Sequence, residues 1–136
     1  MNKQGQAALA RQRIRALTEL LQGQVQRVMG SDPIVRGSFY RYRRRCGKAS
    51  CRCERGALHG GRAFAVRAGG RSRTLRLSGV DLEELARCVG AYRDLRRVRA
   101  EMVRTFRELL RQADKLERLR QISLERLKRR RGSPSL

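Results

Sequence analysis

The chain has 136 residues, and only 4% of them are aromatic, so it has room for one domain but not for a large apolar core. Its 34 Lys and Arg residues face 12 Asp and Glu residues, which gives a formal net charge of +22. This balance favours a polyanion as the partner. No apolar run is long enough to suggest a signal peptide or a membrane span.

The first expected element is an amphipathic helix in residues 1–30. Apolar side chains recur there every three or four residues, which places them on one helix face: Ile14, Leu17, Leu21, Val25 and Val28. The helix is expected to end at Gly30, because glycine stops helices and Pro33 follows shortly afterwards.

Residues 31–79 carry the signals of short β-strands. Apolar and aromatic residues typical of strands occur in residues 34–42, 63–67 and 73–77. The last two runs flank Gly69-Gly70, a pair typical of tight hairpin turns. The segment therefore predicts a β-hairpin or three-strand unit, and an irregular loop packed around the cysteines is the alternative.

From residue 80 onward the pattern becomes helical. Ser78 or Asp81 can cap the start, and apolar residues follow at helical spacing: Leu82, Leu85, Val89, Tyr92, Met102, Phe106, Leu109, Ala113 and Leu116. We expect one long coiled-coil-like helix, or two nearly collinear helices, in residues 80–127, and a basic disordered tail in residues 128–136. The fold class that these elements predict is α+β, mostly α.

Three of the four cysteines and the only histidine fall within fourteen residues: Cys46, Cys51, Cys53 and His59. Zinc prefers four such ligands in a tetrahedron, and three cysteines with one histidine are a common structural set. In a reducing compartment, clustered cysteines favour metal over disulfides. The sequence therefore predicts a structural Zn²⁺ site, and chance clustering of free thiols is the alternative.

Cys88 competes with His59 for the fourth ligand position. It lies beside Val89 in the apolar stripe, where a cysteine usually acts as a small buried hydrophobe. We therefore favour His59 as the ligand and Cys88 as part of the core.

The same region resembles a family of small bacterial zinc-knuckle proteins without a characterised activity. The resemblance covers roughly residues 34–110 and rests on Gly37-Ser38-Phe39, the CGK-x-x-C-R-C motif that starts at Cys46, His59-Gly60 and the AYRDLRR segment that starts at Ala91. The chain departs from the family pattern at Ala49 and Gly61, where proline is usual, and both departures affect turn geometry rather than ligands. The resemblance implies a zinc-stapled fold and a genomic setting near transposases, but no activity.

The basic residues are unevenly distributed along the chain. Residues 36–76 contain 13 basic residues and one acid, Glu54, whereas residues 77–125 contain 11 basic and nine acidic residues. The latter balance is typical of an exposed helix with ion pairs between its turns, so the excess in the middle points to a phosphate-binding surface. Three aromatic residues, Phe39, Tyr40 and Tyr42, can stack on bases or pack in the core. The candidate nucleic-acid-binding residues are Arg41, Arg43, Arg44, Arg45, Lys48, Arg52, Arg55, Arg71 and Arg73.

These patterns predict a nucleic-acid-binding accessory protein that uses a structural zinc knuckle and an arginine-rich surface. DNA is favoured over RNA because the resemblance implies a mobile element. The alternatives are an adaptor subunit whose helices dock a partner protein, such as a transposase, or form a homodimer, and an RNA-binding component of a ribonucleoprotein.

Catalysis is not expected, because the only histidine is an expected metal ligand and no pair of acidic residues lies beside it. We expect no membrane partner and no small-molecule substrate. The expected location is the bacterial cytoplasm, and association with the nucleoid is left open.

Overall fold

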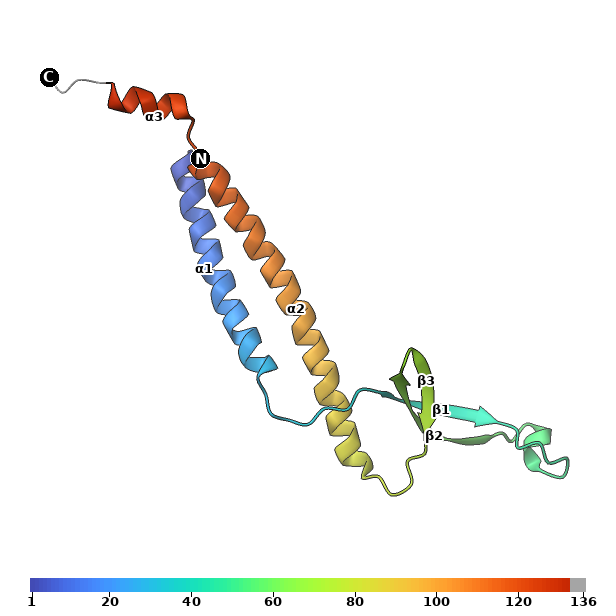
Figure 1. Ribbon diagram of the computed structural model, residues 1–136. Coiled ribbons are helices and arrows are strands. Elements are labelled where there is room, and N and C mark those ends of the chain that lie inside the picture. The colour runs from blue at the N-terminus through green and yellow to red at the C-terminus, as the bar shows by residue number, and fades with distance from the viewer. Residues whose placement is uncertain (133–136) are drawn as a thin grey trace. The chain divides into compact units, whose positions relative to one another are not determined.

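The computed structural model describes residues 1–132, which contain three α-helices and a three-stranded antiparallel sheet (Figure 1). This confirms the expected α+β, mostly helical fold. The chain divides into two compact units. The helical unit comprises Met1–Gly30 and the chain from Arg97 onward, and the sheet unit comprises Ser31–Arg96.

Helix α1 (Lys3–Val28) is the predicted N-terminal helix. Asn2 caps it, because its side-chain Oδ1 accepts a hydrogen bond of 2.8 Å from the backbone N–H of Gly5. Along the helix, every third or fourth side chain is buried or half-buried, and the residues between them are exposed. This pattern indicates that α1 packs on a single face.

Helix α2 (Leu82–Arg120) begins at Asp81, whose Oδ1 accepts hydrogen bonds from the backbone N–H groups of Glu83 and Glu84. It ends seven residues before the expected limit of 127, and a short helix α3 (Leu124–Arg131) follows. Residues 128–131, which we expected to be disordered, are therefore helical. The physical reason is Ser123, whose side chain accepts a hydrogen bond from the N–H of Arg126 and caps α3. Residues 133–136 of the expected tail lie outside the described residues.

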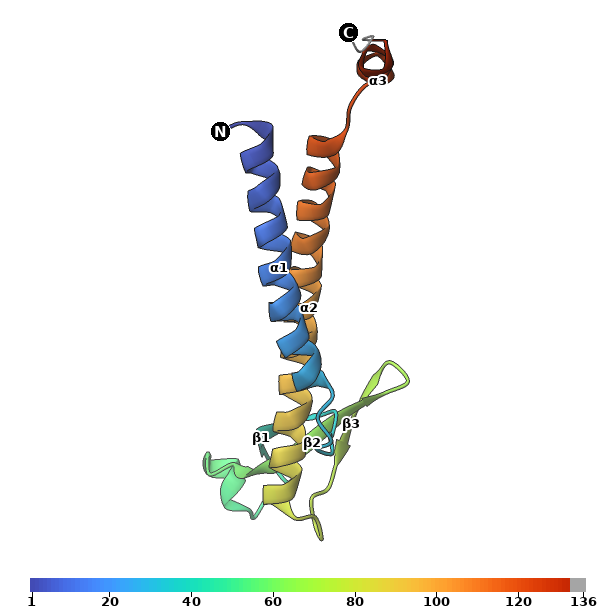
Figure 2. The same ribbon diagram turned by 90° about the vertical axis from the view of Figure 1, so that its left-hand side faces the viewer.

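In the helical unit, α1 and the later part of α2 lie side by side and antiparallel (Figures 1 and 2). The side chain of Gln24 donates a 3.0 Å hydrogen bond to the Thr105 hydroxyl, and Arg27 forms a 3.0 Å ion pair with Glu101. On each helix, buried or half-buried residues recur at a spacing that alternates between three and four positions, and these residues face the other helix. We call the two rows together the seam. It consists of Ala7, Ala10, Ile14, Leu17, Leu21, Gln24 and Val28 of α1, and of Val98, Met102, Thr105, Leu109, Gln112, Leu116 and Leu119 of α2. None of the helices in residues 1–132 has the length and apolar content that crossing a membrane requires.

The seam corrects the predicted apolar stripe of α2. Phe106 and Ala113 were expected in the stripe, but both are exposed, and Phe106 keeps 51% of its surface accessible. Thr105 and Gln112 occupy the corresponding positions instead. Thr105 can enter the seam because Gln24 satisfies its hydroxyl, and the rotation of α2 that buries Thr105 leaves Phe106 outside the seam.

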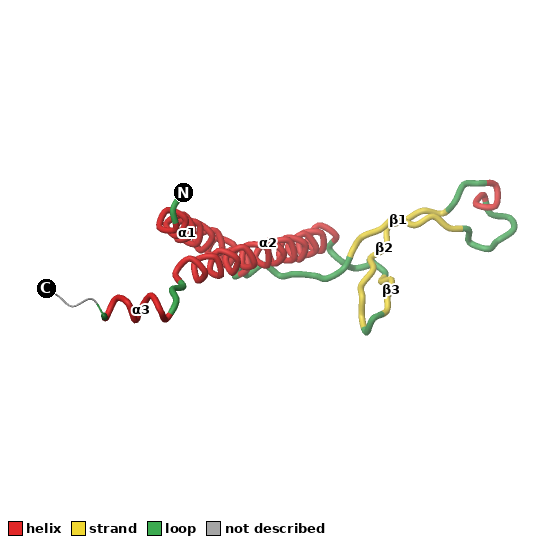
Figure 3. Tube along the Cα trace, turned by 90° about the horizontal axis from the view of Figure 1, so that it is seen from above, coloured by secondary structure: helices red, strands yellow, loops and turns green. Residues whose placement is uncertain are grey.

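The sheet unit contains three strands, β1 (Ser38–Arg44), β2 (His59–Ala68) and β3 (Arg71–Leu75), in the order β1-β2-β3. The predicted hairpin is confirmed, because β2 and β3 pair antiparallel across Gly69 and Gly70. Both glycines have positive φ, at 58° and 76°, which a tight two-residue turn requires. Figure 3 shows β1 and β2 running together into the loop that carries a short 3-10 helix, η1 (Arg52–Arg55).

The core of the sheet unit is small. Phe39 and Phe64 pack edge to face with ring centroids 5.1 Å apart, and the backbone N–H of Val35 donates to the carbonyl oxygen of Cys88 at 3.1 Å. Five side chains of this unit are buried: Cys53, Ala63, Phe64, Cys88 and Val89. Because so little apolar surface is buried, the loop between β1 and β2 requires another source of stability.

Candidate metal centre

The segment of residues 46–59 connects β1 to β2, ends at the first residue of β2, and contains three cysteines and the histidine. We call it the cysteine loop. Its first turn contains Gly47, whose φ of +84° suits glycine, and the N–H of Cys51 donates to the carbonyl oxygen of Lys48 at 3.1 Å. The loop closes where Arg44, the last residue of β1, pairs with His59, the first residue of β2, and this pair holds its ends together.

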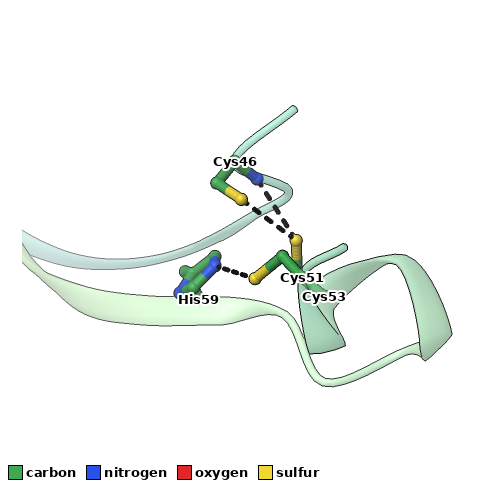
Figure 4. A group of neighbouring side chains, drawn as sticks. All are labelled: Cys46, Cys51, Cys53 and His59. Carbon is green, nitrogen blue, oxygen red and sulfur yellow. Dashed lines mark hydrogen bonds between the residues drawn. The ribbon is translucent and has the colours of Figure 1, made fainter. Parts of the chain in front are cut away.

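The loop brings one nitrogen and three sulfur ligand atoms together, from Cys46, Cys51, Cys53 and His59 (Figure 4). All four atoms lie within 4.8 Å of one another. The sulfur atoms of Cys46 and Cys53 are 3.5 Å apart, and the Cys51 sulfur lies 3.1 Å from Nε2 of His59. A tetrahedral ion with bonds of about 2.0 to 2.3 Å separates its ligands by roughly 3.3 to 3.8 Å. The group therefore fits a tetrahedral metal ion after small side-chain adjustments.

The protonation chemistry of the thiols also suits a metal. A backbone hydrogen bond at Lys48, followed by one from the Cys53 thiol, lowers the pKa of Cys46 from 9.0 to about 6. The thiolate form that binds metals is then the main form of Cys46 at neutral pH. At Cys53, the N–H of Cys46 donates to the sulfur at 3.4 Å and favours the thiolate, but burial and the neighbouring thiols raise the pKa overall. A cation among these sulfurs would offset that rise.

The four side chains differ in exposure: Cys53 is fully buried, Cys51 is half-buried, and Cys46 and His59 are exposed. Cys88 is not a member of the group. It lies in α2 with 8% of its surface exposed, beside the buried Val89. The structure thus places His59, rather than Cys88, with the three clustered cysteines.

The nine candidate nucleic-acid-binding residues are all exposed, but they do not form one cluster. Side chains alternate along a strand, so Arg41 and Arg43 lie on one face of the sheet and Arg44 on the other. By the same alternation, the pairing of β2 with β3 puts Arg71 and Arg73 on the face of Arg41 and Arg43. The remaining four belong to the cysteine loop and its approach: Arg45, Lys48, Arg52 and Arg55.

Two of the nine have partners within the sheet unit. The guanidinium of Arg44 lies 5.4 Å from the centre of the Tyr42 ring, and Arg45 lies 3.9 Å from a carboxylate oxygen of Glu54. The aromatic residues are also engaged, since the Tyr40 hydroxyl is 2.9 Å from the Thr74 hydroxyl and Phe39 packs on Phe64. Phe39 and Tyr40 therefore both have partners within the sheet unit.

Arg62 is a basic residue of β2 that the sequence analysis did not include among the candidates. It is exposed and pairs directly opposite Arg41, on the same face as Arg43. The signal available was a basic side chain directly before the expected strand run of residues 63–67, but its position next to Arg41 depends on the register of β1 and β2.

A family model described as a domain of unknown function (DUF6788) matches residues 8–87, which is more than half of the chain. The chain therefore belongs to this family. The match includes most of α1, which lies outside the region on which the resemblance to zinc-knuckle proteins rested. No curated protein and no solved structure shows significant similarity to the chain.

Proposed function

We propose that this member of the family is a nucleic-acid-binding accessory protein that carries one structural zinc ion in its cysteine loop. The observation that supports it most is the distribution of charge in the sheet unit. All thirteen basic residues between Arg36 and Arg76 are exposed, and Glu54 is the only acid among them. Such a surface attracts phosphates and repels other copies of itself.

Zinc is the metal that fits the ligand set best. Thiolate and imidazole ligands suit Zn²⁺, and a site with four protein ligands is closed, as structural sites are. When bound, the ion would hold the two ends of the cysteine loop together. The loop residues Lys48, Arg52 and Arg55 would then keep fixed positions, which lowers the entropy cost of binding phosphates.

DNA is the nucleic acid that we propose, in the bacterial cytoplasm and in connection with a mobile element. The support is the resemblance to zinc-knuckle proteins found near transposases. Arginine dominates the basic residues, with 30 of 34, and its planar guanidinium can grip phosphate oxygens in pairs. An RNA strand offers the same phosphates, so RNA serves as the comparison ligand.

The test compares two sets of arginines. Replacing Arg43, Arg44 and Arg45 by glutamine should weaken nucleic-acid binding and flatten the plot of log affinity against log salt by about two units, since each lost phosphate contact removes roughly 0.7 to 0.9. The matched control replaces Arg99, Arg104 and Arg107, which are exposed on the nearly balanced α2. Equal losses in both triple variants would contradict the assignment of binding to the sheet unit.

The basic helix α3 needs its own control, because it carries Lys128, Arg129, Arg130 and Arg131. Removing residues after Glu125 should reduce affinity only modestly. If that truncation abolished binding while the Arg43, Arg44 and Arg45 variant kept its affinity, the sheet unit would not be the binding surface.

A second candidate function, self-association, is favoured by an exposed apolar row on the helical unit. Val25 of α1 and Val103, Phe106 and Leu110 of α2 are all more than a third exposed. Each of these residues directly follows a seam residue in the sequence. Because the two helices are antiparallel, a step of one residue from the seam leads to the same side of the pair on both helices. The row contains no charge, so the same row of a second copy matches it chemically, and a homodimer with four packed helices would bury both rows.

Sedimentation or light scattering can test this candidate. The wild type should have the mass of a dimer, and Phe106→Glu should have that of a monomer, whereas the exposed neighbour variant Arg107→Glu should stay dimeric. A monomeric wild type at every concentration would rule out the homodimer and leave the row to another protein.

A further inference from the structure

One face of the sheet carries two adjoining hollows that meet at Arg41 and Arg62. The first, of about 550 Å³, is lined by these two residues and by Tyr42, Arg43, Gly60 and Gly61. We call it the arginine hollow. The second, of about 380 Å³, shares Arg41 and Arg62 and is lined further by Phe39, Tyr40, Leu77, Leu82 and Ala86. We call it the apolar hollow, and both hollows belong to the sheet unit.

The arginine hollow owes its space to Gly60. This residue pairs with Arg43, on the face where Arg41 and Arg62 also lie. A Cβ atom added to Gly60 would meet only the carbonyl oxygen of Tyr42, at an ordinary contact distance of 3.6 Å, and would otherwise point into open space. The absence of a side chain therefore exposes main chain between three guanidinium groups, which allows a ligand to approach closely.

The charges in this hollow are uncompensated. Arg41 and Arg62 are directly opposite each other in the β1–β2 pairing, and like charges in that position destabilise a sheet. Among the described residues, no carboxylate forms an ion pair with Arg41, Arg43 or Arg62. An anion between them would remove the repulsion, and a phosphate suits guanidinium groups because its oxygens accept paired hydrogen bonds.

The apolar hollow has a different chemistry. Phe39 forms one wall and is held in place by its edge contact with Phe64. Leu82 and Ala86, in the first turns of α2, are exposed on the other side. An apolar hollow with two guanidinium groups at its edge suits a flat, polar-edged ring such as a nucleobase.

We propose that the two hollows together hold one unpaired nucleotide of a nucleic-acid strand, with the phosphate in the arginine hollow and the base in the apolar hollow. This inference rests on the proposed function and narrows it to single-stranded nucleic acid. A base inside a duplex is stacked and paired, and it enters a protein pocket only if it is flipped out of the helix. The protein should therefore distinguish a single strand from the same sequence in a duplex.

Two variants test the proposal by filling the hollows without removing any charge. Gly60→Val places a strand-compatible side chain in the open space of the arginine hollow. Ala86→Met extends a side chain from an exposed helical position into the apolar hollow, and methionine is a good helix former. The probe is a labelled oligothymidylate of about 12 nucleotides, alone and annealed to its complement, followed by fluorescence anisotropy.

The wild type should bind the single strand about tenfold more tightly than the duplex, and each variant should lose about tenfold in single-strand affinity while its duplex affinity stays the same. Matched controls make the same changes elsewhere. Ser72→Val lies on the opposite face of the sheet, and Ala100→Met lies on an exposed position of α2 in the helical unit. Both controls should bind like the wild type.

The outcomes separate the inference from the proposed function. If the wild type binds single strand and duplex equally, and both filled variants bind like the wild type, the hollows do not hold a nucleotide although the protein still binds nucleic acid. If the wild type binds neither probe, the proposed function itself fails. Loss with Gly60→Val alone would overturn the placement of the base. Metal content and melting temperature show whether each variant folds, and either variant tests the proposal if the other does not.

Discussion

The two units solve the problem of stability in different ways. The helical unit has a seam of fourteen buried or half-buried side chains, and its helices satisfy their own backbone hydrogen bonds. The sheet unit has five buried side chains, and its segment of residues 36–76 has thirteen exposed basic residues and one acid. The excess of positive charge in residues 36–76 therefore coincides with little apolar burial, since Cys53, Ala63 and Phe64 are the buried side chains of that segment. The comparison teaches that the arginines are a cost to the sheet unit, which the cysteine loop and a polyanionic ligand would offset.

The largest expected effect is on the sheet unit alone. Cys53→Ser, or a strong chelator, should release the proposed zinc and unfold the cysteine loop, because metal-binding energy is folding energy in such sites. The helical unit should keep its far-ultraviolet circular dichroism. Elemental analysis and amide hydrogen exchange in residues 46–59 would measure both effects.

Two control variants accompany this experiment. Cys88→Ala should retain the metal, because Cys88 lies outside the ligand group, whereas His59→Ala should lose most of it. The opposite pair of results would make Cys88 the fourth ligand. If the wild type contained no metal and the amides of its cysteine loop were still protected from hydrogen exchange, the loop would not depend on zinc.

The next effect should fall on the helical unit alone. Leu17 is 4% exposed in the seam, so Leu17→Ala should cost about 2 to 3 kcal/mol of unfolding free energy. Leu20→Ala is the matched control on the same helix, since Leu20 is 53% exposed and should cost little. Urea unfolding followed by circular dichroism would show the difference, and a change in metal content in Leu17→Ala would indicate that the two units do not respond separately.

A smaller effect, of opposite sign, is expected in the sheet. Arg62→Thr removes the like-charge pair with Arg41 and places a strand-favouring residue there, so it should stabilise the sheet unit by about 0.5 kcal/mol. The same variant should weaken nucleic-acid binding. Arg67→Thr, on the opposite face, is the control for both measurements. Destabilisation by Arg62→Thr would mean that the arginine pair is not a cost.

The smallest effect concerns acid and the helical unit. Hydrogen bonds from Gln112, and then from Arg111, lower the pKa of Glu108 below its ordinary value of 4.5. The stability that the charged form adds is therefore complete above pH 4.5 and is lost as the pH falls below it. Glu108→Gln should make acid unfolding of the helices slightly less steep, and the exposed Glu117→Gln should not. Identical acid titrations for all three proteins would show that these hydrogen bonds add nothing.

Features carried by neighbouring residues could be predicted from the sequence. The turn at Gly69 and Gly70 and the grouping of cysteines with His59 each depend on a short stretch of chain. The start of α3 at Ser123 was also visible as a capping residue, but the continuing charge pattern concealed it. Local chemistry determines each of these features, and local reasoning found the turn and the ligand group but missed the start of α3.

Features that depend on distant contacts could not be predicted in this way. Hydrophobicity placed Phe106 in the helix stripe, whereas Thr105 lies in the seam, where it accepts a hydrogen bond from Gln24, 81 residues away in the sequence. Likewise, Arg62 meets Arg41 only because the strands pair in one register. No property of either residue alone contains that information.

The hydrogen bond between Val35 and Cys88 has a consequence for the order in which the chain folds. Those two residues lie near the ends of the sheet unit, which is inserted between the two parts of the helical unit. Once the sheet unit has formed, joining Gln24 to Thr105 closes a much shorter flexible loop than the 81-residue separation in the unfolded chain. The saving in loop-closure entropy is about 1 kcal/mol. We therefore expect the strands and cysteine loop, whose contacts are local, to form first during synthesis, and α1 to wait for its partner helix until the chain beyond residue 97 has emerged.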